Sequence, residues 1–277
     1  LRYDKNEFFE GQLSPRISAV GTIANNHNIR GSFQRGFRIP TTQDQFIDLD
    51  AVTRRLVGSN DLLVNRYNFS PQNSYTSGSV ATARATGNPN DLVLENRVAN
   101  DFKTEKVNTF EVGYKGLFMD GKLLVDAYYY YSRYSDFIAE IDFTQAVPNG
   151  LTGAKVNDDA TVRQQIIDGS IPTQRFGFDI NADGNVESQG WAVEVDYTLA
   201  GGYYVGGNVA FNQLISQNDL LAQGFRASYN TPEYRYNLQF GNRKVTDKLG
   251  FQVNYRWQQA FLWESSFGVG IIPDFGT

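Results

Sequence analysis

Cysteine is absent from this chain of 277 residues, and histidine occurs only once. The lack of cysteine excludes a disulfide framework, a thiolate metal site and a cysteine nucleophile. A single histidine excludes a multi-histidine zinc site within the chain, and it leaves only His27, in a short turn, for a histidine-based catalytic triad. The acidic residues of the loops have no histidine or cysteine near them in sequence. We therefore expect the protein not to be an enzyme and to need no cofactor.

Long apolar runs are also missing, so the sequence contains no transmembrane helix, which needs roughly 18 apolar residues in a row. No signal peptide opens the chain, whose first residues resemble the middle of a strand. The last residues, 271–277, contain no closing strand. We therefore expect a piece of a larger protein. The net charge of −5 argues against a nucleic-acid partner.

Aromatic residues and glycine are abundant, with 20 Phe, 16 Tyr and 26 Gly. The clearest strand signal is the hairpin 107–134, in which Phe110 and Val112 alternate with Thr109 and Glu111. Its second arm alternates in the same way. A period of two over arms of about ten residues predicts paired strands. One face of the hairpin is rich in aromatic residues, and the other carries charges of both signs.

Other segments repeat this alternation, which gives about nine predicted strands in all. They are 1–5, 12–23, 28–37, 107–118, 123–134, 190–199, 203–214, 233–242 and 251–257. The stretch 162–168 predicts a short helix inside a long connection.

The connections between these strands alternate in length. Short ones (24–27, 119–121, 200–202 and 243–248) are interleaved with longer ones (38–106, 135–187 and 215–232). Only the connection 6–11 is shorter than its place in the series predicts. Outer-membrane barrels have this asymmetry, with short periplasmic turns and longer extracellular loops. The fold class is therefore predicted to be all-β, a segment of an antiparallel transmembrane β-barrel. A soluble β-sandwich is the alternative, but it does not explain the alternating loop lengths.

The face opposite the aromatic one is predicted to line a wet lumen, because a dry core could not bury so many unpaired polar groups. We expect its charges to pair with one another or with a plug. They are Arg16, Arg30, Glu111, Lys115, Asp126, Glu194, Asp196, Arg235 and Arg256.

Two segments carry a resemblance to a known family. Gly36–Phe46, GFRIPTTQDQF, resembles the GFR-x-PT-x-x-(D/E)-x-F segment of TonB-dependent outer-membrane receptors. Glu105–Phe118, EKVNTFEVGYKGLF, looks like the barrel segment P-E-x-x-x-x-(F/Y)-E-x-G-x-K of that family, with Thr104 where proline is usual. The hairpin that follows has the style of Bacteroidetes members. The resemblance covers nearly the whole chain, and its motifs are structural.

The resemblance implies that residues 1–277 are part of a single transmembrane β-barrel domain, in the C-terminal part of the barrel. The complete barrel would have about 22 strands and a plugged lumen. The N-terminal plug and the final strands would lie outside this chain. The implied location is the outer membrane of a Gram-negative bacterium, in contact with its lipid.

The implied function is active import of a scarce solute such as a glycan or oligosaccharide, a siderophore or a corrinoid. The TonB–ExbB–ExbD complex would energise import through the plug, and a surface lipoprotein is a further partner if the solute is a glycan. Two alternatives remain open. One is a barrel without transport that serves as a docking subunit of a surface or secretion complex, and the other is a passive porin.

Aromatic side chains in the long loops are candidates for contact with substrate, since aromatic platforms suit sugars or flat chelates. The alternative is that they pack on each other and make the loops rigid. These candidates are Tyr67, Phe69, Tyr75, Phe176, Phe178 and Trp263.

One weak metal candidate is the run Asp179, Asn181 and Asp183, which matches the first half of a calcium-binding loop. The twelfth position is Gly190, where such a loop needs a glutamate. Asn, Asp and Gly are also common in ordinary turns. We therefore expect no bound metal.

Overall fold

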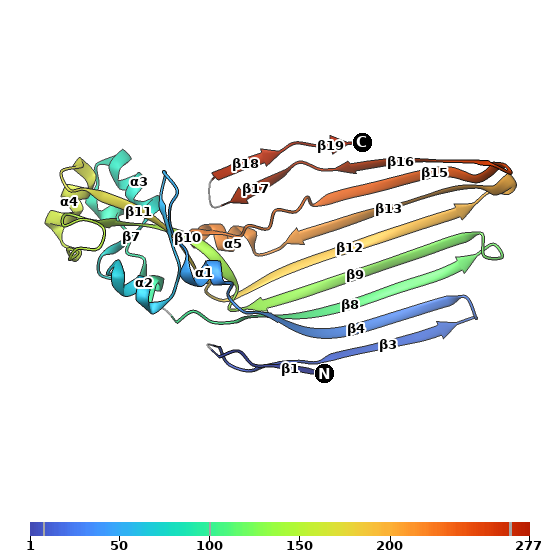
Figure 1. Cartoon of the computed structure of the whole chain (residues 1–277), viewed down its shortest axis with the longest axis horizontal. Helices are drawn as coiled ribbons and strands as arrows, with labels where there is room; N and C mark the ends of the chain where they lie inside the picture. Colours follow the sequence, from blue (N-terminus) through green and yellow to red (C-terminus); the bar gives the residue numbers. More distant parts are fainter. Residues whose placement is uncertain (8, 100, 266–267) are drawn as a thin grey trace.

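The computed structural model describes residues 1–7, 9–99, 101–265 and 268–277. Long strands fill one end of an elongated molecule, and a mixed α/β unit fills the other end (Figure 1). The strands form an antiparallel nine-stranded sheet with the order β19-β16-β15-β13-β12-β9-β8-β4-β3. The long members are β3 (Arg16–Ile23), β4 (His27–Arg38), β8 (Glu105–Phe118), β9 (Leu123–Ser135), β12 (Asn185–Thr198), β13 (Tyr203–Leu214), β15 (Tyr234–Thr246) and β16 (Leu249–Gln258), and β19 (Phe275–Gly276) is short.

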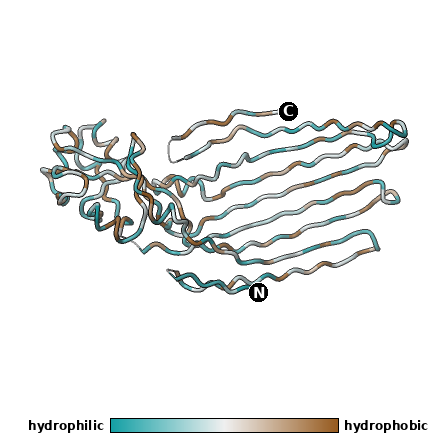
Figure 2. Tube along the Cα trace, in the orientation of Figure 1, coloured by the Kyte–Doolittle hydropathy of each residue, from teal (hydrophilic) through white to brown (hydrophobic). Residues whose placement is uncertain are grey.

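The register of this sheet confirms the predicted two-faced pattern. In the hairpin β8–β9, Phe110 lies opposite Tyr131 and Val112 opposite Tyr129. Lys115 lies opposite Asp126 on the other face. Figure 2 shows hydrophobic and hydrophilic positions in alternation along the long strands. Many apolar side chains of this sheet are exposed, with Val112 at 54% and Val253 at 60%. Val186 and Leu214, at strand ends next to the head, are buried and belong to the core of the head, so the sheet has no core of its own.

The short connections lie together at the far end of the sheet (Figure 1). Ala24 and Asn25 both have positive φ, of 48° and 60°, and so do Met119 and Asp120, at 52° and 56°. Positive φ at successive turn residues matches the right-handed twist of paired strands and allows a tight reversal. Gly121 follows with φ 83°, a conformation that glycine adopts without steric cost.

The predicted strand 12–23 is divided in two, and this is a correction. β2 (Gln12–Ser14) pairs with β1 (Arg2–Asp4) in a separate two-stranded sheet, and β3 starts at Arg16. Pro15 lies between them and has no N–H to donate to a ladder. Its carbonyl still accepts from the Arg35 N–H at 3.0 Å, so the chain stays beside β4.

The longer connections fold into a second unit, which we call the head: residues 39–104, 136–184 and 215–232. Its six-stranded sheet has the order β14-β10-β11-β6-β5, with β7 paired to β10. The strands are β5 (Asp48–Asp50), β6 (Arg55–Val57), β7 (Ser74–Thr76), β10 (Ile138–Ala146), β11 (Thr173–Asn181) and β14 (Phe225–Arg226). No strand was predicted in these connections, so the strands of the head are a correction.

The head also contains the helices of the molecule that are longer than one turn. They are α1 (Thr42–Phe46), α2 (Asp61–Arg66), α3 (Ser77–Thr86), α4 (Ala160–Asp168) and α5 (Gln217–Ala222), and the 3-10 turns η1 (Pro89–Asp91) and η2 (Asn96–Ala99) lie beside them. The predicted helix 162–168 is confirmed within α4. No helix in the described part of the chain is long and apolar enough to cross a membrane.

The motif Gly36–Phe46 has a clear structural role, because it ends β4 and starts α1. The Asp44 N–H donates to Thr41 Oγ1 at 3.1 Å, and Asp44 Oδ2 accepts from the Thr41 N–H at 2.8 Å. This reciprocal capping box satisfies N–H groups that a helix start otherwise leaves unpaired. The chain therefore turns sharply from the long sheet into the head at this motif.

The hydrophobic core of the described residues lies in the head. One cluster surrounds Phe143 and Phe176 on β10 and β11, and a second surrounds Tyr75 and Ile166. The head therefore has a hydrophobic core of its own.

A further pair of strands, β17 (Phe261–Ser265) with β18 (Gly268–Ile272), follows β16.

Candidate functional site

The polar face of the nine-stranded sheet carries a charge network at its centre. Arg30 Nη1 lies 2.9 Å from Asp126 Oδ1, and its Nε lies 3.6 Å from Glu111 Oε1. Lys115 Nζ approaches Asp126 Oδ2 at 3.3 Å. These four side chains come from neighbouring strands and neutralise one another, as charged groups opposite each other in a sheet do.

The remaining charges of this face form no ion pair with any described residue. They are Arg16, Glu194, Asp196, Arg235 and Arg256. Asp196 Oδ1 accepts from Gln239 Nε2 at 2.8 Å, which leaves its charge unmatched. A groove of about 880 Å³ runs over Glu194, Arg235 and Arg256. This face can therefore accept a partner surface that brings charges of both signs.

Five of the six loop aromatics lie in the head core and are not available to a ligand. Tyr67, Phe69, Tyr75, Phe176 and Phe178 are at most 6% exposed. The Phe69 ring lies 4.8 Å from that of Phe143 and 4.9 Å from that of Phe176, at steep interplanar angles. Edge-to-face packing of this kind stabilises the head.

The hydroxyl groups of two of these aromatics also form hydrogen bonds within the head. The Tyr67 hydroxyl donates to Asp48 at 2.8 Å, and the Tyr75 hydroxyl donates to Asp158 at 2.8 Å. The expectation that these rings face a substrate is therefore corrected, and the alternative, mutual packing, describes them. Trp263 differs, because it lies on β17 and is 43% exposed.

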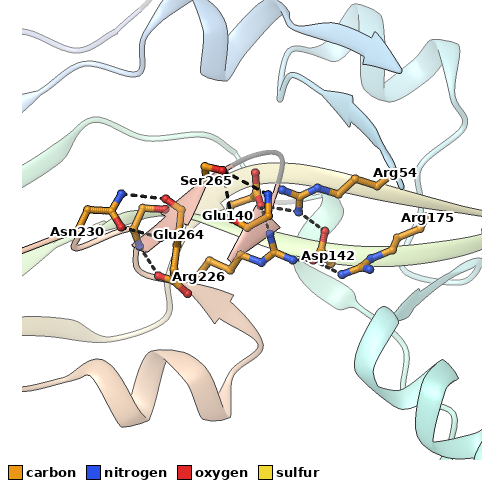
Figure 3. A network of polar contacts seen from close by, with 10 residues as sticks. Arg54, Glu140, Asp142, Arg175, Arg226, Asn230, Glu264 and Ser265 are labelled. Atoms are coloured by element: carbon orange, nitrogen blue, oxygen red, sulfur yellow. Dashed lines mark hydrogen bonds and ion pairs between the residues drawn. The ribbon is translucent and has the colours of Figure 1, made fainter. Parts of the chain in front are cut away.

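One face of the head sheet is charged and nearly buried (Figure 3). Arg54 Nη1 lies 2.6 Å from Glu140 Oε1 and also contacts Asp142. Asp142 Oδ2 accepts from Arg175 at 2.6 Å and from Arg226 at 2.7 Å. Burial raises the pKa of Glu140, and the nearby guanidinium of Arg54 opposes that rise. The arginines make it possible to bury these carboxylates.

The three residues of the weak calcium candidate have different surroundings. Burial, followed by the charge of Glu140, raises the pKa of Asp179 to about 7, so this carboxyl ionises less readily than an exposed one. The Asn181 amide ties Lys103 to Asp136, since its Oδ1 accepts from the Lys103 N–H at 2.6 Å and its Nδ2 donates to the Asp136 carbonyl at 2.6 Å. Asp183 is exposed in the turn. No cluster suited to a metal occurs among the residues that the structure describes.

A second groove, of about 900 Å³, lies in the head, where all three longer connections meet. Its walls come from α3, from the paired strands β10 and β11 and from the end of α5. Ser77, Arg84, Thr144, Thr173 and Arg175 all line it. Sequence reasoning missed these residues because each is a single polar residue in a long connection. The alternation of Thr173 and Arg175 on β11 is the one local signal that they share a face.

Comparison with known proteins identifies the family of the chain. The family model described as "TonB dependent receptor-like, beta-barrel" matches residues 1–277. None of the curated proteins gives a match.

Solved structures share the fold at low sequence identity. The ferric enterobactin receptor of Pseudomonas aeruginosa is 13% identical with a TM-score of 0.59, over 99% of this chain and 33% of that one. The siderophore receptor PirA of the same organism is 13% identical with a TM-score of 0.53, over 99% and 33%. The copper transporter OprC is 13% identical with a TM-score of 0.52, over 95% and 30%.

This chain thus spans about a third of the length of the solved structures that it resembles. The match of the family model over the full chain agrees with the antiparallel sheet, its two faces and the alternating lengths of its connections. The chain belongs to the family of TonB-dependent receptor-like β-barrels.

Proposed function

We propose that the full-length protein is an active transporter of the bacterial outer membrane that imports a scarce solute. In this proposal the apolar face of the nine-stranded sheet contacts lipid, and the polar face lines the lumen. The head lies at the extracellular end and captures the solute. A plug inside the barrel couples import to the TonB complex of the inner membrane.

The observation that carries this proposal is the division of the chain into a two-faced sheet and a folded head. The exposed apolar side chains of the sheet, such as Val112 and Val253, suit a hydrocarbon environment. Its unmatched lumen charges suit a polar plug. The head offers a solute-sized groove built from three connections, as expected for a capture site on loops that a rigid scaffold positions.

The relatives support transport as the general role, since two are described as receptors for siderophores or their iron complexes and one as a copper transporter. They do not determine the solute of this chain. A glycan, an iron chelate and a corrinoid all remain within the proposal, and a surface lipoprotein remains a candidate partner.

Uptake by a deletion strain tests the proposal. We expect loss of the gene to abolish uptake of at least one radiolabelled iron chelate, corrinoid or oligosaccharide, and we expect complementation to restore it. Uptake should also stop when the proton gradient is collapsed or TonB is removed. Uptake that depends on this protein but not on TonB would identify a passive porin. Unchanged uptake of every solute tested would contradict transport and favour a docking subunit.

A further inference from the structure

We propose that the groove between α3, the paired strands β10 and β11, and α5 is a binding subsite for a carboxylate group on a hydroxylated ligand. This inference rests on the proposed function, because it names the chemical class of the solute that the head captures.

The first observation is a positioned cation without a counter-charge. Arg84, near the end of α3, donates from Nε to the Ile166 carbonyl at 3.0 Å and from Nη2 to Thr173 Oγ1 at 3.1 Å. Both partners are neutral, and Arg84 forms no ion pair with any residue in the described ranges. Two hydrogen bonds therefore hold the guanidinium in place at the groove and leave its charge available.

The second observation is a second guanidinium on the same wall. Thr173 and Arg175 are two residues apart on β11, so their side chains stand on one face of the sheet. Arg175 is bound to Asp142 by Nη2 alone, at 2.6 Å, and its side chain is 43% exposed. Thr173 holds the guanidinium of Arg84, and both Arg84 and Arg175 line the groove.

Hydroxyl groups continue this wall toward the start of α3. Thr144 lies directly opposite Arg175 in the β10–β11 register. Its Oγ1 is 2.9 Å from Ser77 Oγ. Thr144 is buried and its hydroxyl is bonded to Ser77, so Ser77 and Thr173 are the residues whose hydroxyls can donate to or accept from ligand hydroxyls. Gly78 next to Ser77 leaves open space, since an added Cβ would meet no atom within 4 Å.

Most of the charged side chains that line the groove are paired with each other. Glu95 holds Arg97 through two bonds of 2.7 Å, and Asp142 accepts from Arg175 at 2.6 Å. Of the other lining charges, Arg84 is bound to neutral groups and Asp183 is exposed. The cation that the groove offers to a ligand is therefore Arg84.

These features select one ligand chemistry. A guanidinium matches a carboxylate in a planar fork and binds it more strongly than a neutral group does. The hydroxyl wall adds selectivity for a ligand that carries hydroxyls. None of the described residues that line the groove is aromatic, so a flat aromatic chelate would find no stacking surface. The volume of about 900 Å³ suits a small organic ligand.

Titration calorimetry on the purified full-length protein tests this subsite. The probes are citrate, ferric citrate and a digalacturonate, with the neutral disaccharide cellobiose as the comparison. We expect at least one carboxylate probe to bind, more weakly as salt is raised, and cellobiose to bind at least about 10-fold more weakly. A preference for ferric citrate would identify a chelate as the source of the carboxylate, and a preference for digalacturonate would identify an acidic glycan.

Five variants locate the binding. Arg84→Gln and Arg175→Gln should each weaken the carboxylate probe by about 10-fold or more, since each removes a charged donor. Arg66→Gln is the matched control: it removes an exposed arginine of the head that pairs with Asp48, away from the groove. It should change the affinity less than about two-fold. Arg84→Lys and Arg175→Lys keep the charge and should retain part of the binding, which separates a direct role from a folding defect.

Two results would overturn the subsite. One is the absence of binding of all three carboxylate probes to the wild-type protein at concentrations up to about 10 mM. The other is an unchanged affinity in both glutamine variants. If TonB-dependent uptake of another solute persists in such a case, the subsite is wrong and the proposed transport stands. If no energised uptake is found but the groove binds its probe, the transport proposal fails and the subsite stands.

Discussion

Replacement of Val112 by arginine tests which face of the sheet contacts lipid. Val112 is the eighth of the 14 residues of β8 and so lies near the middle of the strand. It is 54% exposed, and its neighbours across the two ladders are Gly31 and Tyr129. Neither of these residues carries a negative charge that could neutralise an arginine. In the proposed orientation, the change would therefore place an uncompensated charge in the hydrocarbon near the bilayer midplane.

The expected cost is about 2–4 kcal/mol of the free energy of unfolding. The cost depends on depth, so the same change at Leu249, the first residue of β16 beside a short turn, should cost only about 0–1 kcal/mol. Ser32→Arg is the control at nearly the same depth as Val112, because Ser32 is next to Gly31 in β4. Ser32 lies opposite Glu111 on the polar face, so its replacement should cost less than about 0.5 kcal/mol.

Denaturant titration of the full-length protein in phospholipid bilayers gives these free energies, and the fraction that inserts gives an independent readout. The three variants should rank Val112→Arg as most destabilising, then Leu249→Arg, then Ser32→Arg. Equal costs at Val112 and Ser32 would show that the two faces experience the same environment. The assignment of the apolar face to lipid would then be wrong.

Three further predictions concern the head. Because burial raises the pKa of Asp179 to about 7, the native head holds a proton that the unfolded chain releases above about pH 4. The stability of the head should therefore fall as the pH rises from about 4 through 7, and Asp179→Asn should remove this loss. Hydrogen exchange of the β10 and β11 amides measures this stability. An identical pH profile in the variant would refute the role of the Asp179 carboxyl. Arg38 and Glu105 lie 3.2 Å apart and bind the carbonyl and the N–H of Ile138, where the chain enters the head. Glu105→Gln should weaken this junction by roughly 1.5–3 kcal/mol and speed amide exchange at Ile138, and a double-mutant cycle with Arg38→Met should show coupling. Phe69→Ala should lower the free energy of unfolding of the head by about 3–5 kcal/mol, because the buried ring leaves a cavity. Proteolysis of the head should become faster while the long sheet stays protected. Uniform proteolysis would mean that the two parts do not unfold separately.

The sequence predicted the long sheet well because its signals are local. A membrane strand repeats its two faces every two residues, so Phe110 and Val112 can be assigned to one face without knowing their neighbours. The short turns are also local, since tight reversals need residues such as Asp120 and Gly121 that tolerate positive φ. Loop lengths then revealed which end of the sheet carries the long connections.

The head was not predicted, although β10 and β11 also alternate. Ile141 and Phe143 face the core, and Glu140 and Asp142 face the other side. These carboxylates are nearly buried, and ion pairs with arginines from other parts of the chain offset the cost of their desolvation. The partners are far away in sequence, so a charged strand of this kind looks like an exposed loop.

The candidate site shows the same difference between local sequence signals and contacts that join distant segments. The sequence by itself determined the family, the two faces of the sheet and the charges of the polar face, because period and spacing are properties of neighbouring residues. Only the tertiary structure decided that the loop aromatics are core and that Arg84 and Arg175 share a groove wall. The physical reason is that burial and charge pairing depend on which distant segments meet, and three connections far apart in sequence meet in the head.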